Sequence, residues 1–192
     1  MATADKQVFS LLALLATDLP GCGTADKVAA LERALGEFCR RSRCWRESLT
    51  VAMEDGATAA VLAWPCGAYA SSVTLVAIDG VSVAGHCCTR LVPSRSLDGA
   101  QVLEFTHAPV SGGAWTLTLV GTLQPRRGEI DVPDWMFDRY GDAIADGAKA
   151  LLKLHARKPY SDPGGAVECK RAFERGIADA ACDGAQRERG IA

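Results

Sequence analysis

The chain has 192 residues, of which 48% are hydrophobic and 23% are charged, and its formal net charge is −2. This length and composition suit one globular domain with a subdomain, and they exclude a chain dominated by disorder. They also exclude a general attraction to nucleic acid, because binding by counterion release needs a net basic surface.

The first predicted element is a helix from Ala4 to Thr17, where apolar residues recur at steps of three and four. Its nearly apolar stretch, Val8 to Ala16, is too short to span a bilayer. Asp5 and Asp18 flank that stretch and no small-residue cleavage site follows cleanly. We therefore interpret it as a buried helix face rather than a signal peptide.

A second, amphipathic helix follows, with Thr24 as its expected N-cap. Arginines crowd its other end, where cations interact favourably with the helix dipole. Arg33 and Arg40 lie on the side away from the apolar stripe. That stripe comprises Val28, Leu31, Leu35, Phe38 and Trp45.

From Leu49 to Leu123 the apolar period changes from helical to alternating, which predicts strands. Asp79 and Gly80 stand between two of them and suit a two-residue type I′ hairpin, because both central residues of that turn need positive φ. The connections are too short for crossover helices, which favours antiparallel pairing. The predicted strands are Leu49–Met53, Ala60–Trp64, Val73–Ile78, Val81–Gly85, Thr89–Val92, Val102–Phe105 and Trp115–Leu123.

Two more helices are predicted after residue 129. Pro133 suits the first turn of the third helix, whose apolar face comprises Phe137, Tyr140, Ile144, Ala148 and Leu151. Ser161 or Asp162 begins the fourth, and Gly184 marks its end. Its buried side comprises Ala166, Cys169, Phe173 and Ile177. The residues that remain, 185–192, lack a period and predict a tail that does not pack alone.

The order of these elements predicts an α+β fold: a helical bundle of about four helices, an antiparallel β-rich insertion between the second and third helices, and an extended C-terminal tail. Residues 1–48 and 130–184 form the bundle domain, residues 49–129 the insertion and residues 185–192 a docking tail. The shared helical core is expected to contain Phe38, Trp45, Phe137, Tyr140, Leu151 and Phe173.

Two stretches of the sequence resemble a known family. An Ala-rich helix that ends in Phe38-Cys39, followed by basic residues, Trp45 and a strand, resembles the first long helix of head-to-tail connector (adaptor) proteins of tailed bacteriophages. The second stretch runs from Val132-Pro133-Asp134-Trp135 to Leu154, and a Lys158-Pro159-Tyr160-Ser161-Asp162-Pro163 turn leads on to a helix around Phe173. Together they cover roughly half of the chain, and neither is a catalytic fingerprint.

The resemblance implies a structural virion protein rather than an enzyme. It implies a homo-oligomeric ring, dodecameric in the family, that joins the portal protein to a distal tail protein and surrounds the DNA channel without sequence-specific binding. The protein would be made in the host cytoplasm and end at the head-tail interface of the virion, with no membrane association, no metal and no cofactor. Tails in the family reach onto the portal, so the candidate portal-binding residues are Arg187, Arg189, Ile191 and Ala192; the alternative is a frayed end.

Four aspartates recur every fourth residue along the third helix: Asp134, Asp138, Asp142 and Asp146. Like charges at this spacing repel by a few tenths of a kcal/mol per pair, which a positively charged partner would relieve. We therefore take Asp134, Asp138 and Asp142, together with Arg33 and Arg40, as a candidate subunit interface. The alternative interpretation is a solvated acidic face, because exposed charge pairs contribute little.

The sequence offers little for catalysis. The eight cysteines show no paired Cys-x-x-Cys spacing, and the cluster His86-Cys87-Cys88 lacks a second pair at zinc-ligand spacing. None of His86, His107 and His155 stands in a hydrolase, metalloprotease or phosphate-binding motif. One alternative stays open: a small cytoplasmic enzyme or ligand-binding module that uses the β-rich region as a pocket. In it, His107 could act as the base for a nucleophilic cysteine. His155 is expected to be a core or interface residue.

Overall fold

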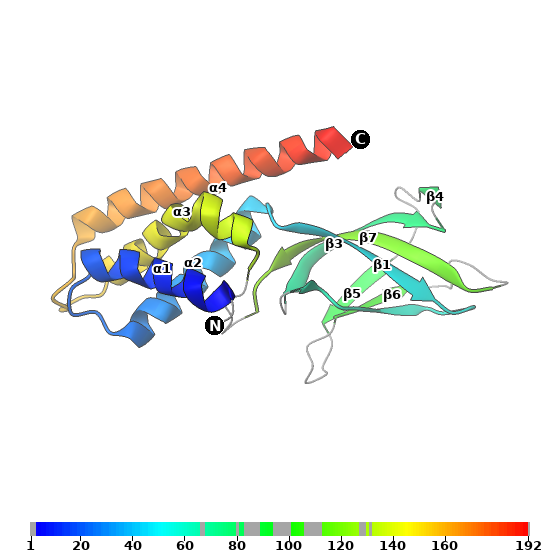
Figure 1. Ribbon diagram of the computed structural model, residues 1–192, viewed down its shortest axis with the longest axis horizontal. Helices are drawn as coiled ribbons and strands as arrows, with labels where there is room; N and C mark the ends of the chain where they lie inside the picture. The colour runs from blue at the N-terminus through cyan, green and yellow to red at the C-terminus, as the bar shows by residue number, and fades with distance from the viewer. Residues whose placement is uncertain are drawn as a thin grey trace. The chain divides into compact units, whose positions relative to one another are not determined.

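Figure 1 shows the computed structural model of the chain, which describes residues 3–65, 68–79, 81–82, 89–93, 101–105, 113–126, 130 and 132–191. The chain divides into two compact units. The helical unit comprises residues 1–44 and 125–192, and the strand unit comprises residues 45–124. The boundaries expected at residues 49 and 129 fall slightly later than the observed ones.

The predicted α+β fold, with a β-rich region between the second and third helices, is confirmed. In the described part of the chain the helices are α1 (Thr3–Asp18), α2 (Thr24–Ser42), α3 (Asp134–Lys153) and α4 (Pro163–Ile191). The N-cap of α2 is Gly23 rather than Thr24, and no side chain caps this end. Glycine is itself a common N-cap residue, so the helix begins one residue earlier than the threonine suggested.

Three aromatic rings from three helices meet in the core of the helical unit. The ring centroid of Phe38 in α2 lies 5.3 Å from that of Tyr140 in α3 and 6.2 Å from that of Phe173 in α4. All three side chains are buried. Gly147 of α3 makes room for this cluster, since a Cβ atom there would lie 2.6 Å from Cδ2 of Phe173. The predicted aromatic core of the bundle is therefore present.

Two members of the predicted core are corrected. Leu151 is only half-buried, and the next residue, Leu152, is buried in its place. Trp45 is buried but is the first residue of the strand unit, and it does not belong to α2. The cause is Arg43, which adopts a left-handed conformation with φ 52° and donates its backbone N–H to the carbonyl of Cys39, ending the helix.

The fourth helix is longer than the sequence predicts. The cap is as expected, because Asp162 Oδ1 accepts a hydrogen bond of 2.9 Å from the backbone N–H of Gly165. The predicted end of this helix is wrong, because α4 continues through Gly184 to Ile191. The predicted extended tail over residues 185–192 is therefore helical up to Ile191. Ala192 lies outside the described residues. A glycine weakens a helix by only about 1 kcal/mol and need not end it.

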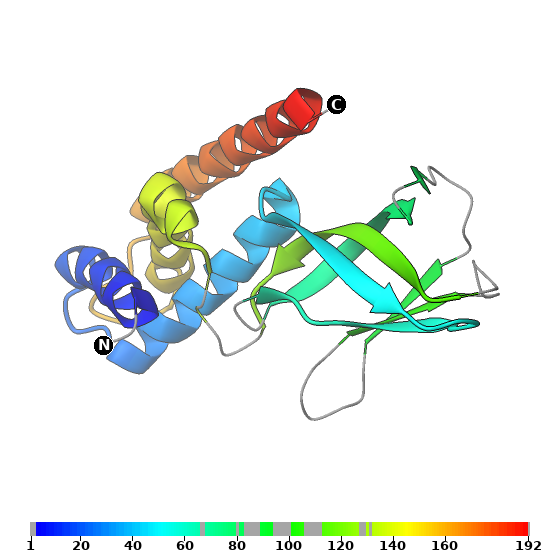
Figure 2. The same cartoon turned by 45° about the vertical axis from the view of Figure 1, so that its right-hand side comes forward.

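Within the helical unit, α3 packs against all of the other helices, and α1 and α4 lie on different sides of it (Figure 2). The close approach of α3 and α4 depends on small residues. A Cβ atom at Gly176 would lie only 2.4 Å from Cβ of Ala143. This arrangement leaves one side of α3 facing solvent, which is where its aspartates are found.

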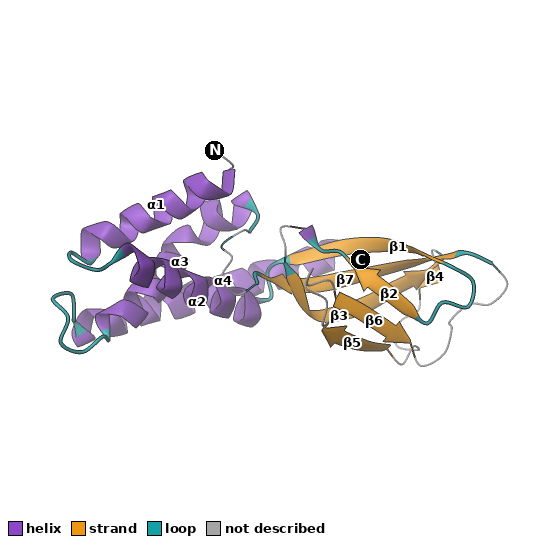
Figure 3. Cartoon of the chain, turned by 90° about the horizontal axis from the view of Figure 1, so that it is seen from below, coloured by secondary structure: helices purple, strands orange, loops and turns teal. Residues whose placement is uncertain are grey.

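The strand unit contains two antiparallel sheets, drawn in orange in Figure 3. One has the order β1-β7-β3-β4 and the other the order β2-β6-β5. The seven predicted strands are confirmed over the residues that the structure describes, with differences of a few residues at their ends. Residues 83–85 of the predicted strand Val81–Gly85 lie outside the described residues. Their observed bounds are β1 Arg46–Met53, β2 Ala59–Leu62, β3 Tyr69–Ile78, β4 Val81–Ser82, β5 Thr89–Pro93, β6 Gln101–Phe105 and β7 Trp115–Gln124.

β3 and β4 pair through Ile78 and Val81, on either side of the expected turn; Gly80, the second residue of that turn, lies outside the described residues. Asp79 has φ 48°, as the first central residue of a type I′ turn requires. Its carboxylate also accepts hydrogen bonds from the backbone N–H and the hydroxyl of Thr116, at 2.6 and 3.2 Å. The aspartate therefore fixes both the turn and its position beside β7.

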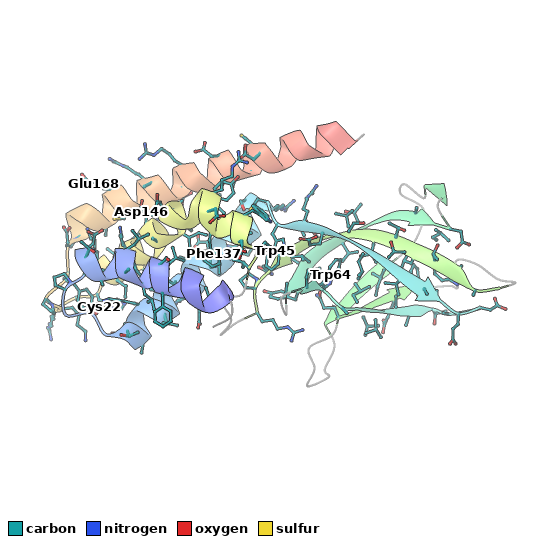
Figure 4. All side chains as sticks on the ribbon, in the orientation of Figure 1. Cys22, Trp45, Trp64, Phe137, Asp146 and Glu168 are labelled. Carbon is teal, nitrogen blue, oxygen red and sulfur yellow. The ribbon has the colours of Figure 1, made fainter. Side chains whose placement is uncertain are left out.

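A side chain joins the two sheets by forming the pair of backbone hydrogen bonds that a neighbouring strand would form. Gln101 of β6 is buried; its Oε1 accepts from the N–H of Ala70 at 2.6 Å, and its Nε2 donates to the carbonyl of Ala70 at 2.8 Å. The pairing of β3 with β7 shifts register beside Ala70. Trp64, labelled in Figure 4, lies over Gly121, where a Cβ atom would come within 2.4 Å of the indole ring.

Candidate functional site: the charged faces of the helical unit

The aspartate series of α3 is placed as predicted, along the side of the helix away from the core. Asp134, Asp138 and Asp142 are exposed, and Asp146, labelled in Figure 4, is half-buried. Their surroundings differ. Nζ of Lys149 lies 3.6 Å from Asp146 and 2.6 Å from Asp18 of α1, so the last member of the series is already neutralised within the chain.

Asp18 and Lys149 form the best-defined of these pairs. The hydrogen bond from Lys149 lowers the pKa of Asp18 against the opposing effect of its burial. Asp134 also has an interaction within the chain. Asp138 and Asp142 have no ion pair in the part of the chain that the structure describes. These two carboxylates are consequently the ones available to another molecule.

The arginines of α2 also fall into one that is ion-paired within the chain and others that have no ion pair among the described residues. Arg41 donates two hydrogen bonds to Glu174 of α4, one of 2.8 Å from Nη1, and contacts Glu37 at 3.2 Å. This pairing lowers the pKa of Glu174. Arg33 and Arg40 are exposed and have no ion pair among the described residues. The two arginines chosen from the sequence are therefore also free of partners within the described chain.

The candidate arginines and aspartates do not meet within one chain. The ring of Phe38 faces the ring of Tyr140 across the contact between α2 and α3. Arg40 follows Phe38 by two residues, and Asp142 follows Tyr140 by two, which is about 200° of rotation on each helix. Arg40 and Asp142 thus point away from each other, on opposite sides of the α2-α3 pair.

A groove of about 650 Å³ runs between α3 and α4 beside these aspartates. Four aspartates and two arginines line it: Asp142, Asp146, Asp179, Asp183, Arg139 and Arg175. Asp183 accepts a hydrogen bond of 2.5 Å from the hydroxyl of Tyr140 and an ion pair of 2.7 Å from Arg139. Burial, and then Asp183, raise the pKa of Tyr140, so its hydroxyl stays protonated and donates.

The candidate portal-binding residues lie at the end of α4. Arg187, Arg189 and Ile191 belong to the helix by their backbone, but their side chains lie outside the description, as does Ala192 as a whole. Among the residues of α4 whose burial is described, which end at residue 185, the last buried one is Ala180.

Five of the eleven histidines and cysteines lie outside the described part of the chain, namely Cys66, His86, Cys87, Cys88 and His107. Among the described residues, no group of three histidine, cysteine or acidic side chains could hold a metal ion. His155, expected in the core or at an interface, is exposed, with its ring 6.3 Å from that of Tyr160. The core position is therefore wrong, and the interface stays a prediction. Burial raises the pKa of Cys39, which behaves as a core residue, while Cys169 is half-buried.

A groove in the strand unit is another candidate for ligand binding. A groove of about 320 Å³ lies beside β1 and β2 and is lined chiefly by alkyl side chains such as Val51, Met53 and Val61, with Glu54 as its charged member. Across the described residues, no helix is both long enough and apolar enough to cross a membrane.

The ion pairs between helices were not predicted from the sequence. The spacing of Glu37 and Arg41 by four residues predicts their helical contact. The pairs between Arg41 and Glu174, and between Arg139 and Asp183, depend on how the helices are aligned, which no local spacing encodes. No family model matches the chain, and no curated protein matches its sequence.

Proposed function

We propose that the protein is a structural component of a tailed-bacteriophage virion, a head-to-tail connector that forms a ring between the portal and the tail. The ring, dodecameric by analogy with the resembled family, surrounds the channel through which DNA passes without sequence-specific binding. A distal tail protein binds its far rim. In this proposal the protein carries no catalytic site, metal or cofactor, and it acts by assembly at the head-tail interface.

One observation carries this proposal. The two stretches that resemble connector proteins are separated by the whole strand unit, yet their residues form one core. Phe38 comes from the first stretch, and Tyr140 and Phe173 come from the second. The two stretches therefore fold into the single helical unit that the resemblance implies.

The surface of the helical unit is consistent with repeated self-association. Among the described residues, Asp138 and Asp142 on α3 and Arg33 and Arg40 on α2 have no ion pair, and the two sets lie on opposite sides. Contacts between unlike patches of identical subunits generate rings when the rotation closes. The C-terminal turns of α4 are the proposed portal-binding element, and because they are helical, part of the ordering cost of docking is already met.

The experiment that tests the function is a measurement of mass in solution, with and without purified portal protein. We expect a monomer or a ring alone, and a complex of defined mass with portal, seen as closed rings by negative-stain electron microscopy. A chain that stays monomeric and does not bind portal contradicts the connector and favours the alternative, a small ligand-binding module or enzyme that uses the groove of the strand unit.

A further inference from the structure

We propose that neighbouring subunits of the ring dock head to tail, with Arg33 and Arg40 of one subunit's α2 against the groove between α3 and α4 of a second copy of this chain. The inference rests on the proposed function, since it names the contact by which the ring forms. It also adds α4 to the interface, because Asp179 lies on the rim of the groove opposite Asp142.

The basic and acidic faces of the helical unit point in opposite directions. Arg40 and Asp142 point away from each other, because each follows by two residues an aromatic ring in the α2-α3 contact. Arg33 and Asp138 are exposed on the same two sides. Unlike surfaces on opposite sides of a subunit meet when identical copies are placed in a row, and such a contact is heterologous. A two-fold dimer would instead bring like charges together.

The groove keeps a net negative charge after the internal ion pairs are counted. In the groove, Arg139 is bound to Asp183, and Asp146 is bound to Lys149. Asp142 and Asp179 then share the groove with Arg175, which has no ion pair among the described residues, and exposed Asp138 lies beside them on α3. The surface keeps an excess of negative charge, which a pair of guanidinium groups from another copy would neutralise.

The shape of the groove also fits this contact. Small residues, among them Ala143, Ala172 and Gly176, line part of it. Ala143 and Gly176 are in close contact, with an added Cβ at Gly176 only 2.4 Å from Cβ of Ala143. Carboxylates of both helices line the same groove, so a guanidinium group that enters it can reach both helices. The long, flexible side chains of Arg33 and Arg40 suit such a groove.

The test is a charge-reversal series measured by ring yield at fixed protein and portal concentration. The acidic variant carries Asp142→Lys and Asp179→Lys, and the basic variant carries Arg33→Glu and Arg40→Glu. Like charges in contact cost several kcal/mol, so we expect each variant alone to lose about tenfold or more of its ring yield. A chain with all four substitutions restores opposite charges at every contact, and its yield should recover to near that of the wild type.

Controls keep the result specific. Glu168→Lys changes an exposed charge on α4 outside the groove and should leave the yield unchanged. Melting curves of the free chains show whether each variant folds, and the pair Asp142→Asn with Asp179→Asn replaces the lysine variant if that one does not. Rings that form equally well in all variants, or a four-fold variant that does not recover, overturn the head-to-tail contact while leaving the connector in place. A wild-type chain that never forms rings overturns both.

Discussion

The helical unit and the strand unit are each stabilised internally by a different kind of interaction. In the helical unit, buried aromatic rings form the core, and ion pairs such as Arg41 with Glu174 link one helix to another at the surface. In the strand unit, a buried side chain forms hydrogen bonds to the backbone of the other sheet, as Gln101 does with Ala70. The difference shows where partners can be recognised: charged side chains on helices are accessible and can be paired by another molecule, whereas the amide of Gln101 is already occupied.

The contrast also bears on how each unit tolerates change. Aromatic packing in the helical unit depends on volume, since Gly147 leaves room only for the ring of Phe173. The link between the sheets depends on hydrogen-bond partners, because an unpaired buried donor or acceptor has its own cost. Substitutions can therefore separate the two kinds of stabilisation.

The largest effect is expected for Phe173→Ala in the helical unit. The side chain is 5% exposed and contacts both Phe38 and Gly147, so its removal should lower the free energy of unfolding by about 3 to 5 kcal/mol. Chemical denaturation followed by far-ultraviolet circular dichroism measures this loss. Val167→Ala is the control, because Val167 is 51% exposed on the same helix and should change stability by less than about 0.5 kcal/mol. A loss below about 1 kcal/mol for Phe173→Ala would place the ring at the surface.

A smaller loss is expected for Gln101→Met in the strand unit. Methionine keeps the length of the side chain but leaves the N–H and carbonyl of Ala70 without their partners, at about 1 to 3 kcal/mol. Three tryptophans, Trp45, Trp64 and Trp115, lie in this unit, so its unfolding can be followed by fluorescence. Gln101→Glu keeps an acceptor for the N–H but loses the donor, and it should not rescue stability. An unchanged midpoint for Gln101→Met would show that water replaces the link.

How far the sequence predicts this molecule can be judged from particular residues. Periodicity located the helices and strands, and it identified Phe38, Tyr140 and Phe173 as core, because burial of one face imposes a period. It placed Leu151 one residue away from the buried Leu152, an error of about 100° around the helix. It also ended α4 at Gly184, where the structure continues.

The candidate interface was only partly predictable for a related reason. The spacing of Asp138, Asp142, Arg33 and Arg40 placed them on outer faces, and the structure agrees that they are exposed. Asp179 was not found, because its position opposite Asp142 depends on the alignment of α3 with α4. Gln101 was missed as well, since a glutamine in an alternating strand gives no signal that it will bind the backbone of another sheet.

Alanine substitutions at two helical glycines test whether packing volume limits the helical unit. Gly147→Ala removes a weak helix former but brings a methyl group against Phe173, and crowding of this kind costs about 1 to 3 kcal/mol. Gly36→Ala in α2 makes the same chemical change where nothing lies within 4 Å, and it should stabilise by up to about 1 kcal/mol. Opposite signs in thermal melting confirm that the ring fills the space beside Gly147. Stabilisation by both substitutions would mean that the ring moves aside.

Acid should weaken the helical unit through its ion pairs. Arg41 lowers the pKa of Glu174, and Lys149 lowers that of Asp18. A carboxylate with a lowered pKa in the folded state stabilises the protein above its unfolded pKa, and that contribution is lost as the pH falls through the folded value. Stability measured by circular dichroism should therefore fall below about pH 4. Glu174→Gln should make the decline shallower, whereas Glu168→Gln, at an exposed residue, should leave it unchanged.

The smallest effect on stability, and the sharpest on function, is expected from deletion of residues 185–192. Residues 185–192 lack an apolar period, so their deletion should remove little from the core, and the melting temperature should hardly change. If the end of α4 binds the portal, the truncated chain should lose attachment to portal-bearing heads in a sedimentation assay. The double variant Arg187→Ala and Arg189→Ala should weaken attachment in part, and more strongly at low salt, because screening already weakens these contacts at high salt. A truncated chain that attaches as well as the full-length chain would move the portal-binding surface to the packed helices.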